Sequence, residues 1–160
     1  MEQNWYGFIV PLYNEEYERL FKVAYRKTRD RELAQDLVQE VFLLAIFNQT
    51  KLMKHPKPGA WLMQTLQNLI MNELRSLSHK DIPLDEAIEI PARAMCESLE
   101  GLLPTQLQAK EREILILRFE QNMSYSEMSD RLGVSEVLCR KWVSKAVIKC
   151  RYFLREQQSS

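Results

Sequence analysis

Six positively charged side chains near the end of the chain have the chemistry needed to bind phosphate groups and base edges. They are Arg140, Lys141, Lys145, Lys149, Arg151 and Arg155, and no acidic residue separates them. Guanidinium and ammonium groups neutralise DNA phosphates and pair with guanine. A solvated surface helix is the plain alternative, but mixed charges serve solubility better than six of one sign. We therefore expect this segment to contact DNA.

Two helices joined by a tight turn must position these charges. Ser124 and Glu127 have the spacing of a capping box, which predicts a helix that begins near Tyr125. Gly133 stands where that helix must turn, and Ser135 can cap the next one. The second helix has an apolar stripe at helical spacing, formed by Cys139, Val143, Ala146, Cys150 and Phe153. The pattern predicts a helix-turn-helix whose basic second helix enters the major groove.

Length and composition indicate a globular protein without a membrane span. The chain has 160 residues, 46% of them apolar, and its 22 basic and 22 acidic side chains cancel. A zero net charge argues against a general polyanion-binding protein. No apolar run reaches the roughly 18 to 20 residues that a membrane span requires, and no signal-peptide pattern is present. We therefore expect a cytoplasmic protein.

The sequence contains no pattern typical of catalysis or metal binding. No nucleophile is paired with a base, and four glycines leave little room for a phosphate-cradling loop. Cys96, Cys139 and Cys150 form no CxxC pair, and no histidine stands at zinc-ligand spacing. Cys139 and Cys150 would lie roughly 16 Å apart on one helix, too far for a disulfide. We expect no catalytic residue, metal or cofactor, and apolar packing for these two cysteines.

Hydrophobic periodicity predicts an all-α fold of two small helical domains joined by an acidic linker. Helices are expected over 17–28, over 33–45 after a cap at Asp30, and over 61–74 after Pro58, and a basic loop is expected over 48–58.

The domain boundaries follow from the same periodicity. Three helices with short connections can share one core, which makes 1–78 the first domain. Periodicity is lost over the linker, 79–98, where prolines and acids prevail: 76–101 holds 2 basic and 6 acidic residues. It returns from Leu99, so the second domain is 99–160.

Three blocks of the chain together resemble the extracytoplasmic-function group of bacterial RNA polymerase sigma factors. AQDLVQEVFLLA at 34–45 is similar to that family's polymerase-binding helix, and WLMQTLQNLIMNELR at 61–75 to the helix that melts and reads the minus-ten element. EREILILRF at 111–119, SYSEM at 124–128 and the basic helix resemble the module that reads the minus-thirty-five element. The resemblance implies a three-helix promoter-melting domain, a linker and a helix-turn-helix domain.

In the first domain the resemblance implies two sites. An acidic and amide face would meet a basic coiled-coil clamp of polymerase, and it consists of Gln35, Asp36, Gln39 and Glu40; a solvated face is the alternative. Asn68 is the first choice for holding a flipped base of the minus-ten element, supported by Gln64, Asn72 and Arg75. Gln64 and Asn72 fit solvated helix positions equally well. The loop lysines are expected to touch phosphates, and they are Lys51, Lys54 and Lys57.

In the second domain the resemblance implies minus-thirty-five contacts from the early turns of the recognition helix. The expected contacts are Glu136, Val137, Arg140, Lys141 and Lys145. Arg140 and Lys141 can pair with guanine or with phosphates, and Lys145 and Lys149 are expected at phosphates. Val137, Leu138 and Trp142 depart from the residues common in the family, so a different promoter preference is expected.

The resemblance implies a sigma factor that binds core RNA polymerase, directs promoter recognition and transcription initiation, and is not itself an enzyme. Its partners would be core polymerase, promoter DNA and, as is frequent in the family, an anti-sigma factor. The acidic linker could lie in the RNA path of polymerase or act as a simple tether. Two other functions remain open: a helix-turn-helix regulator that acts without polymerase, and a helical adaptor whose basic face meets an acidic protein.

Overall fold

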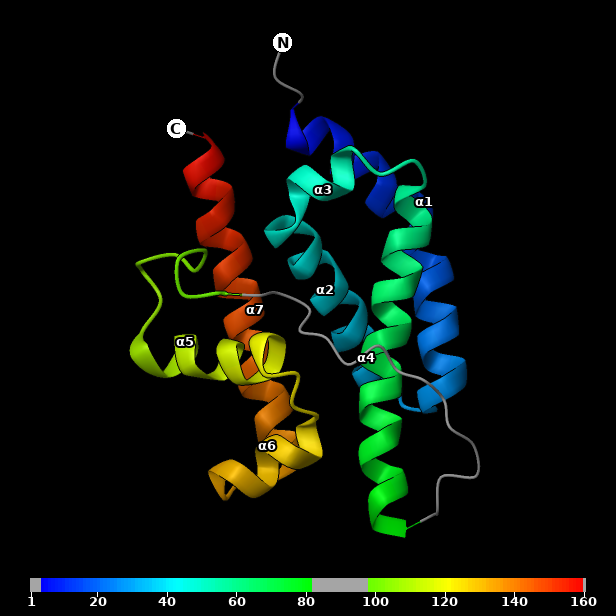
Figure 1. The fold of residues 1–160 in the computed structure, drawn as a ribbon, viewed down its shortest axis with the longest axis vertical. Coiled ribbons are helices and arrows are strands. Elements are labelled where there is room, and N and C mark those ends of the chain that lie inside the picture. The colour runs from blue at the N-terminus through cyan, green and yellow to red at the C-terminus, as the bar shows by residue number, and fades with distance from the viewer. Residues whose placement is uncertain (1–3, 82–97, 160) are drawn as a thin grey trace. The chain divides into compact units, whose positions relative to one another are not determined.

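The computed structural model describes residues 4–81 and 98–159, with side chains described over 4–75 and 98–156. Within these ranges every regular element is helical and none is a strand, which confirms the predicted all-α class. The chain divides into two compact units, 1–70 and 71–160. Each unit is a helical assembly (Figure 1), and each has its own buried side chains.

The first unit contains α1 (Trp5–Thr28), α2 (Arg31–Phe47), α3 (Gln49–Met53) and the beginning of α4 (Pro58–Asp81). The helix predicted over 17–28 ends where expected but begins much earlier, because the side chain of Asn4 accepts a hydrogen bond from the backbone N–H of Tyr6 at 3.0 Å. Asp30 caps α2 as predicted, and its carboxylate accepts from the N–H of Leu33 at 3.0 Å. The loop predicted over 48–58 was partly wrong, since α3 lies inside it.

The core of the first unit forms where the apolar faces of these helices meet. α1 packs along α2, and α3 contacts both of them. The side chains that are fully buried, with no exposed surface, include Leu20, Ala24, Leu37, Val41, Leu52, Leu62, Leu66 and Ile70. This core fixes the polar faces of α2 and α4, which carry the predicted sites.

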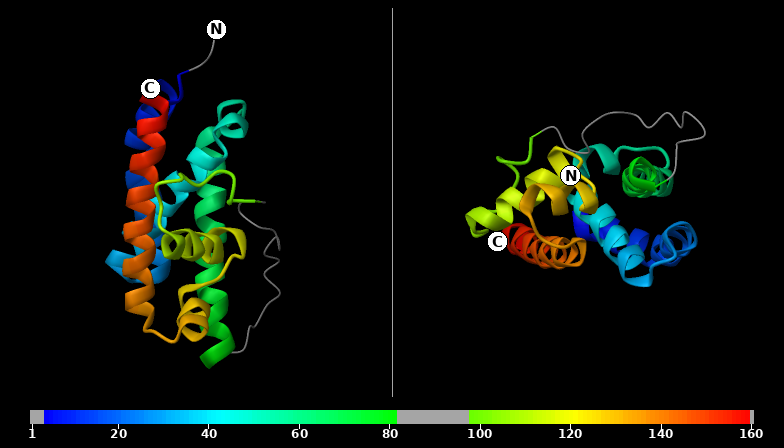
Figure 2. Two further views of the ribbon diagram at one scale, coloured as in Figure 1. Left: turned by 90° about the vertical axis from the view of Figure 1, so that its left-hand side faces the viewer. Right: turned by 90° about the horizontal axis from the view of Figure 1, so that it is seen from below.

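The second unit contains the end of α4, α5 (Ala109–Leu115), the π-helical turn η1 (Ile116–Glu120), α6 (Tyr125–Leu132) and α7 (Glu136–Ser159). α5 and α6 both pack against α7, and Figure 2 shows α7 as the long helix of this unit. Helical periodicity was expected from Leu99, but 98–108 contains turns, and the first helix begins only at Ala109. Leu99, Leu103 and Leu107 are nevertheless buried, so the apolar spacing reflected packing rather than helix.

The π-helical turn was not predicted. It is closed by a hydrogen bond from the N–H of Gln121 to the carbonyl of Ile116 at 3.0 Å, one residue wider than an α-turn. The predicted linker lies almost wholly outside the described residues, and so do three of its acidic residues, Asp85, Glu86 and Glu89. The domain boundaries 1–78, 79–98 and 99–160 therefore remain a prediction, and they differ from the bounds of the two compact units, 1–70 and 71–160.

Candidate nucleic-acid and polymerase interfaces

Local hydrogen bonds build the turn between α6 and α7. The hydroxyl of Ser124 accepts from the N–H of Glu127 at 3.1 Å, and the Glu127 carboxylate accepts from the N–H of Ser124 at 2.9 Å, as the capping box predicts. Gly133 ends α6 with φ of 70°, a left-handed conformation that costs glycine little. Ser135 accepts from the N–H of Leu138 at 3.1 Å and so caps α7. The predicted helix-turn-helix is thus confirmed element by element.

α7 has one buried face and one basic face. Four residues of the predicted apolar stripe are confirmed as buried, with Cys139, Val143, Ala146 and Cys150 at 1% exposure or less, whereas the fifth, Phe153, is only partly buried. Four of the five predicted DNA contacts are exposed together along the first turns, namely Glu136, Val137, Lys141 and Lys145. The fifth, Arg140, is partly buried and interacts within the chain. The helix can therefore present carboxylate, isopropyl and ammonium groups to a DNA groove.

Two contacts tie α5 to the flank of α7. The carboxylate of Glu111 accepts a hydrogen bond from Lys149 Nζ at 2.7 Å, and this bond lowers the pKa of the Glu111 carboxyl. One residue earlier, Lys110 Nζ lies 4.1 Å from the centroid of the Trp142 ring. All three lysines on this part of α7 are exposed, but Lys149 is paired with a carboxylate, whereas no ion pair is found for Lys141 or Lys145 within the described residues.

Both described cysteines are buried free thiols, as their place in the apolar stripe predicted. Burial raises the pKa of Cys139, and it raises the pKa of Cys150 to about 12. A thiol of that kind is inert at neutral pH. Among the described residues, no group of histidine, cysteine, aspartate and glutamate side chains could hold a metal ion.

The four residues predicted for the minus-ten element fall into two pairs along α4. In the first unit, Gln64 is exposed and its Nε2 donates to Asn68 Oδ1 at 3.1 Å. In the second unit, Arg75 Nη2 donates to Asn72 Oδ1 at 2.6 Å, and Asn72 Nδ2 donates to the carbonyl of Asn122 at 2.8 Å. Asn72 is 8% exposed, so the second pair is held by the protein itself, whereas in the first pair Gln64 is exposed and Asn68 is partly exposed.

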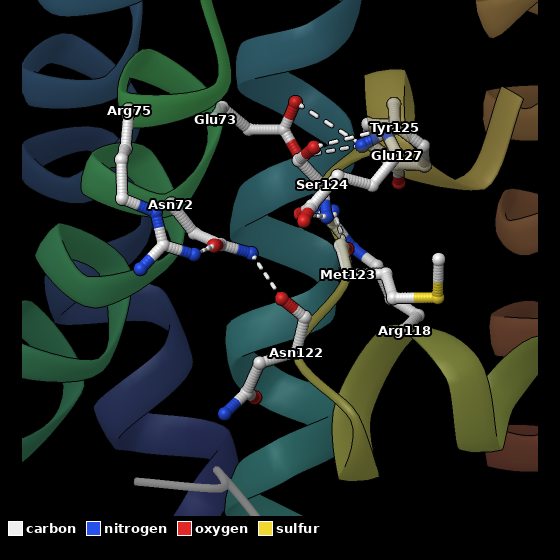
Figure 3. Close-up of polar contacts among 9 residues, drawn as sticks. All are labelled: Asn72, Glu73, Arg75, Arg118, Asn122, Met123, Ser124, Tyr125 and Glu127. Carbon is white, nitrogen blue, oxygen red and sulfur yellow. Dashed lines mark hydrogen bonds and ion pairs between the residues drawn. The ribbon is translucent and has the colours of Figure 1, made fainter. Parts of the chain in front are cut away.

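A buried ion pair lies beside Asn72 and was not predicted (Figure 3). Arg118 Nη1, on the π-helical turn, donates to Glu73 Oε1 at 2.5 Å and to the carbonyl of Met123 at 2.9 Å. The same Glu73 oxygen accepts from the N–H of Tyr125, the first residue of α6, at 3.1 Å. The guanidinium also lies 3.9 Å from the centroid of the Tyr125 ring. Glu73 and Arg118 together therefore hold the start of α6.

The sequence contains one feature that could have predicted a buried ion pair, which is a single arginine, Arg118, inside an apolar run. In the string ILILRF the neighbours of Arg118 are all hydrophobic, and a charged side chain in such a place needs a partner. Nothing in the local sequence points to Glu73 as that partner, because 45 residues separate the two.

The predicted polymerase-binding face of α2 is only partly open. Gln35 is exposed, Asp36 is partly exposed, and Gln39 Nε2 donates to the hydroxyl of Tyr13 at 3.3 Å. Glu40 is 1% exposed and interacts within the chain. The lysines predicted to touch phosphates are all exposed, and these are Lys51, Lys54 and Lys57.

Two family models match the chain, and together they cover most of it. Sigma-70 region 2 matches residues 12–80, which include the α2 face and the α4 pairs. Sigma-70 region 4 matches residues 105–150, which include the helix-turn-helix. The chain belongs to the extracytoplasmic-function group of sigma factors. The predicted family and the predicted role, a sigma factor that directs promoter recognition, are thereby confirmed.

Three relatives of this sigma factor are 25–28% identical to it over most of its length. A sigma factor SigL of Mycobacterium tuberculosis is 26% identical over 91% of this chain and 88% of its own length. A sigma factor SigM of Bacillus subtilis is 28% identical over 77% of this chain and 83% of its own. A probable sigma factor RfaY of Xanthomonas campestris is 25% identical over 78% of this chain, but the match spans only 34% of that protein.

Family membership implies that this sigma factor binds core RNA polymerase and promoter DNA. Sigma factor families are known as non-catalytic. Across the described parts of the chain, no helix has both the length and the apolar character needed to cross a bilayer.

Proposed function

We propose that this sigma factor binds core polymerase through α2 and reads promoter DNA at two places, one on α4 and one on α7. The observation that carries the proposal is the pairing of an open amide pair on α4 with an exposed basic face on α7, in one chain that matches both sigma regions. We also infer a cytoplasmic location, where core polymerase works.

For polymerase binding we propose direct contacts from Gln35, Asp36 and Gln39. All three are at least partly exposed on one face of α2, and a carboxylate among amides suits a basic partner surface. Glu40 is buried, so we leave it out of the direct contacts. Replacing Asp36 by Arg should abolish capture of core polymerase, whereas Glu18→Arg, the same charge change at an exposed site of α1, should preserve it.

For the minus-ten element we propose that Asn68 holds a flipped base while Gln64 orients its amide. The bond from Gln64 Nε2 occupies the Asn68 oxygen, which leaves the Asn68 N–H groups to donate to a base edge. Asn72 and Arg75 would join only after exchanging their present partners. Asn68→Ala should reduce promoter opening more than it reduces initial polymerase binding. Promoter opening is measured by permanganate oxidation of unpaired thymines.

For the minus-thirty-five element we propose base or phosphate contacts from the first turns of α7. The exposed residues Glu136, Val137, Lys141 and Lys145 line this surface, and Arg140 stands beside them. The deciding experiment is to mix the purified chain with core polymerase and a random-sequence duplex library. The proposal requires promoter selection only when polymerase is present. Tight, selective binding by the chain alone would instead identify a regulator that acts without polymerase.

A further inference from the structure

Resting on the proposed contact between α7 and upstream promoter DNA, we propose that Lys110 of α5 is a further DNA phosphate contact, positioned by the ring of Trp142. Lys110 is exposed, and its Nζ lies 4.1 Å from the centroid of that ring. It was not among the DNA contacts predicted from the sequence. The contact adds a second helix to the DNA-binding surface of this unit.

The ring of Trp142 restricts the Lys110 side chain before any ligand binds, which reduces the entropy lost on binding. A lysine side chain is free to adopt many rotamers, and much of that freedom is lost when it binds one phosphate. A cation over an indole is attracted by the electrons of the ring face, so the ring holds the ammonium in place before DNA arrives. Because the ring approaches from one side, the ammonium keeps N–H groups that can donate to a phosphate oxygen.

The charges around Trp142 favour a phosphate as the ligand. Lys141 precedes Trp142 directly and Lys145 follows it by three residues, so both ammonium groups belong to the same stretch of α7. Lys110 adds a third cation from α5. Within the described residues, no ion pair neutralises Lys110, whereas Lys149, further along the same seam, is bound by Glu111. The three cations near Trp142, namely Lys110, Lys141 and Lys145, are therefore available to a phosphate, whereas Lys149 is paired with Glu111.

A purely structural role for the pair makes a different prediction. If Lys110 only helped α5 to pack on α7, its loss would change stability slightly and leave the salt dependence of DNA binding unchanged. A phosphate contact, by contrast, displaces a counterion, and each such contact contributes about −0.9 to the slope of log K against log salt.

The experiment measures that slope for polymerase holoenzyme reconstituted with the full chain. The probe is a duplex selected from a random library by the wild-type holoenzyme. Lys110→Gln should make the negative slope less steep by about 0.9, which corresponds to roughly eightfold weaker binding at 0.1 M salt. Lys22→Gln, at an exposed site of α1, is the matched control and should leave the slope unchanged.

Two replacements of Trp142 test the positioning role. Trp142→Phe keeps a ring for the cation and should retain most of the affinity, whereas Trp142→Leu should approach the effect of Lys110→Gln. Adding Lys110→Gln to Trp142→Leu should then cost little more, because the second change removes a contact already weakened. A separate readout is ethylation interference, in which Lys110→Gln should remove the effect of one upstream phosphate.

The outcomes separate this inference from the function on which it rests. An unchanged slope and an unchanged ethylation pattern for Lys110→Gln, with a less steep slope for Lys145→Gln, would overturn the Lys110 contact alone. Equal slopes for Trp142→Phe and Trp142→Leu would overturn the positioning role of the ring. A wild-type holoenzyme that selects no duplex would overturn the proposed function together with this contact.

Discussion

Removal of the Glu73 carboxylate should destabilise the second unit severely. The Arg118 side chain is 0% exposed and the Glu73 side chain 9%, so each charge depends on the other for compensation. Replacing Glu73 by Leu leaves the guanidinium buried and removes the acceptor for the N–H of Tyr125. Leaving one charge of a buried pair uncompensated costs about 3–5 kcal/mol. That is a large share of the roughly 5–15 kcal/mol that stabilises a typical domain.

The assay is urea unfolding followed by circular dichroism at constant pH and salt. With a slope of about 2 kcal/mol per molar urea, the midpoint of the affected transition should fall by roughly 2 M. Glu73→Gln keeps an oxygen for the N–H of Tyr125 and should be milder. The double variant Glu73→Leu, Arg118→Met removes both charges and should recover most of the loss, because an apolar pair carries no desolvation penalty.

Two results would refute this reasoning. The first is a midpoint for Glu73→Leu close to that of the wild type, which would mean that the carboxylate does not compensate Arg118. The second is a double variant whose loss equals the sum of the two single losses, since residues in direct contact must show coupling.

Three further predictions concern the second unit. Gly133→Ala should cost about 1 kcal/mol of stability in thermal unfolding, because φ of 70° penalises a Cβ, and Gly133→Asn should cost less. The Glu111 carboxyl should titrate below its usual pKa by carbon-13 NMR and return to the usual range in Lys149→Met; the stabilisation that the ion pair gives should be present above that range and lost as pH falls through the lowered value. In a variant with Cys150 as the sole cysteine, the thiol should resist disulfide reagents at pH 8, where a pKa of about 12 leaves roughly one thiol in ten thousand ionised, and react at once in urea.

The sequence predicted those parts of the structure that local chemistry encodes. The capping box at Ser124, the glycine at 133 and the cap at Asp30 each act over a few residues, and each lies where predicted. The short helix α3 was missed because its five residues include no cap and too few apolar positions to show a period. The π-helical turn was missed because a run such as ILILRF fits any helical pitch.

The candidate sites also include features that the local sequence predicts and features that depend on distant contacts. Exposure of Lys141 and Lys145 follows from the apolar stripe on the opposite side of α7, so sequence periodicity sufficed. Burial of Asn72 depends on a carbonyl 50 residues away, and the position of Lys110 depends on how α5 packs against α7. Contacts between residues distant in the chain leave no periodic trace in the sequence.

The first residue of α6 is held by a carboxylate that lies 52 positions earlier in the chain. A fragment cut at residue 99, at the start of the predicted second domain, would contain Arg118 and Tyr125 but lack Glu73. In such a fragment the Arg118 guanidinium would lack the carboxylate that compensates its charge. A chimera that joins α7 and the rest of 99–160 to a first part without a carboxylate at position 73 would have the same defect, unless Glu73 is included with Arg118.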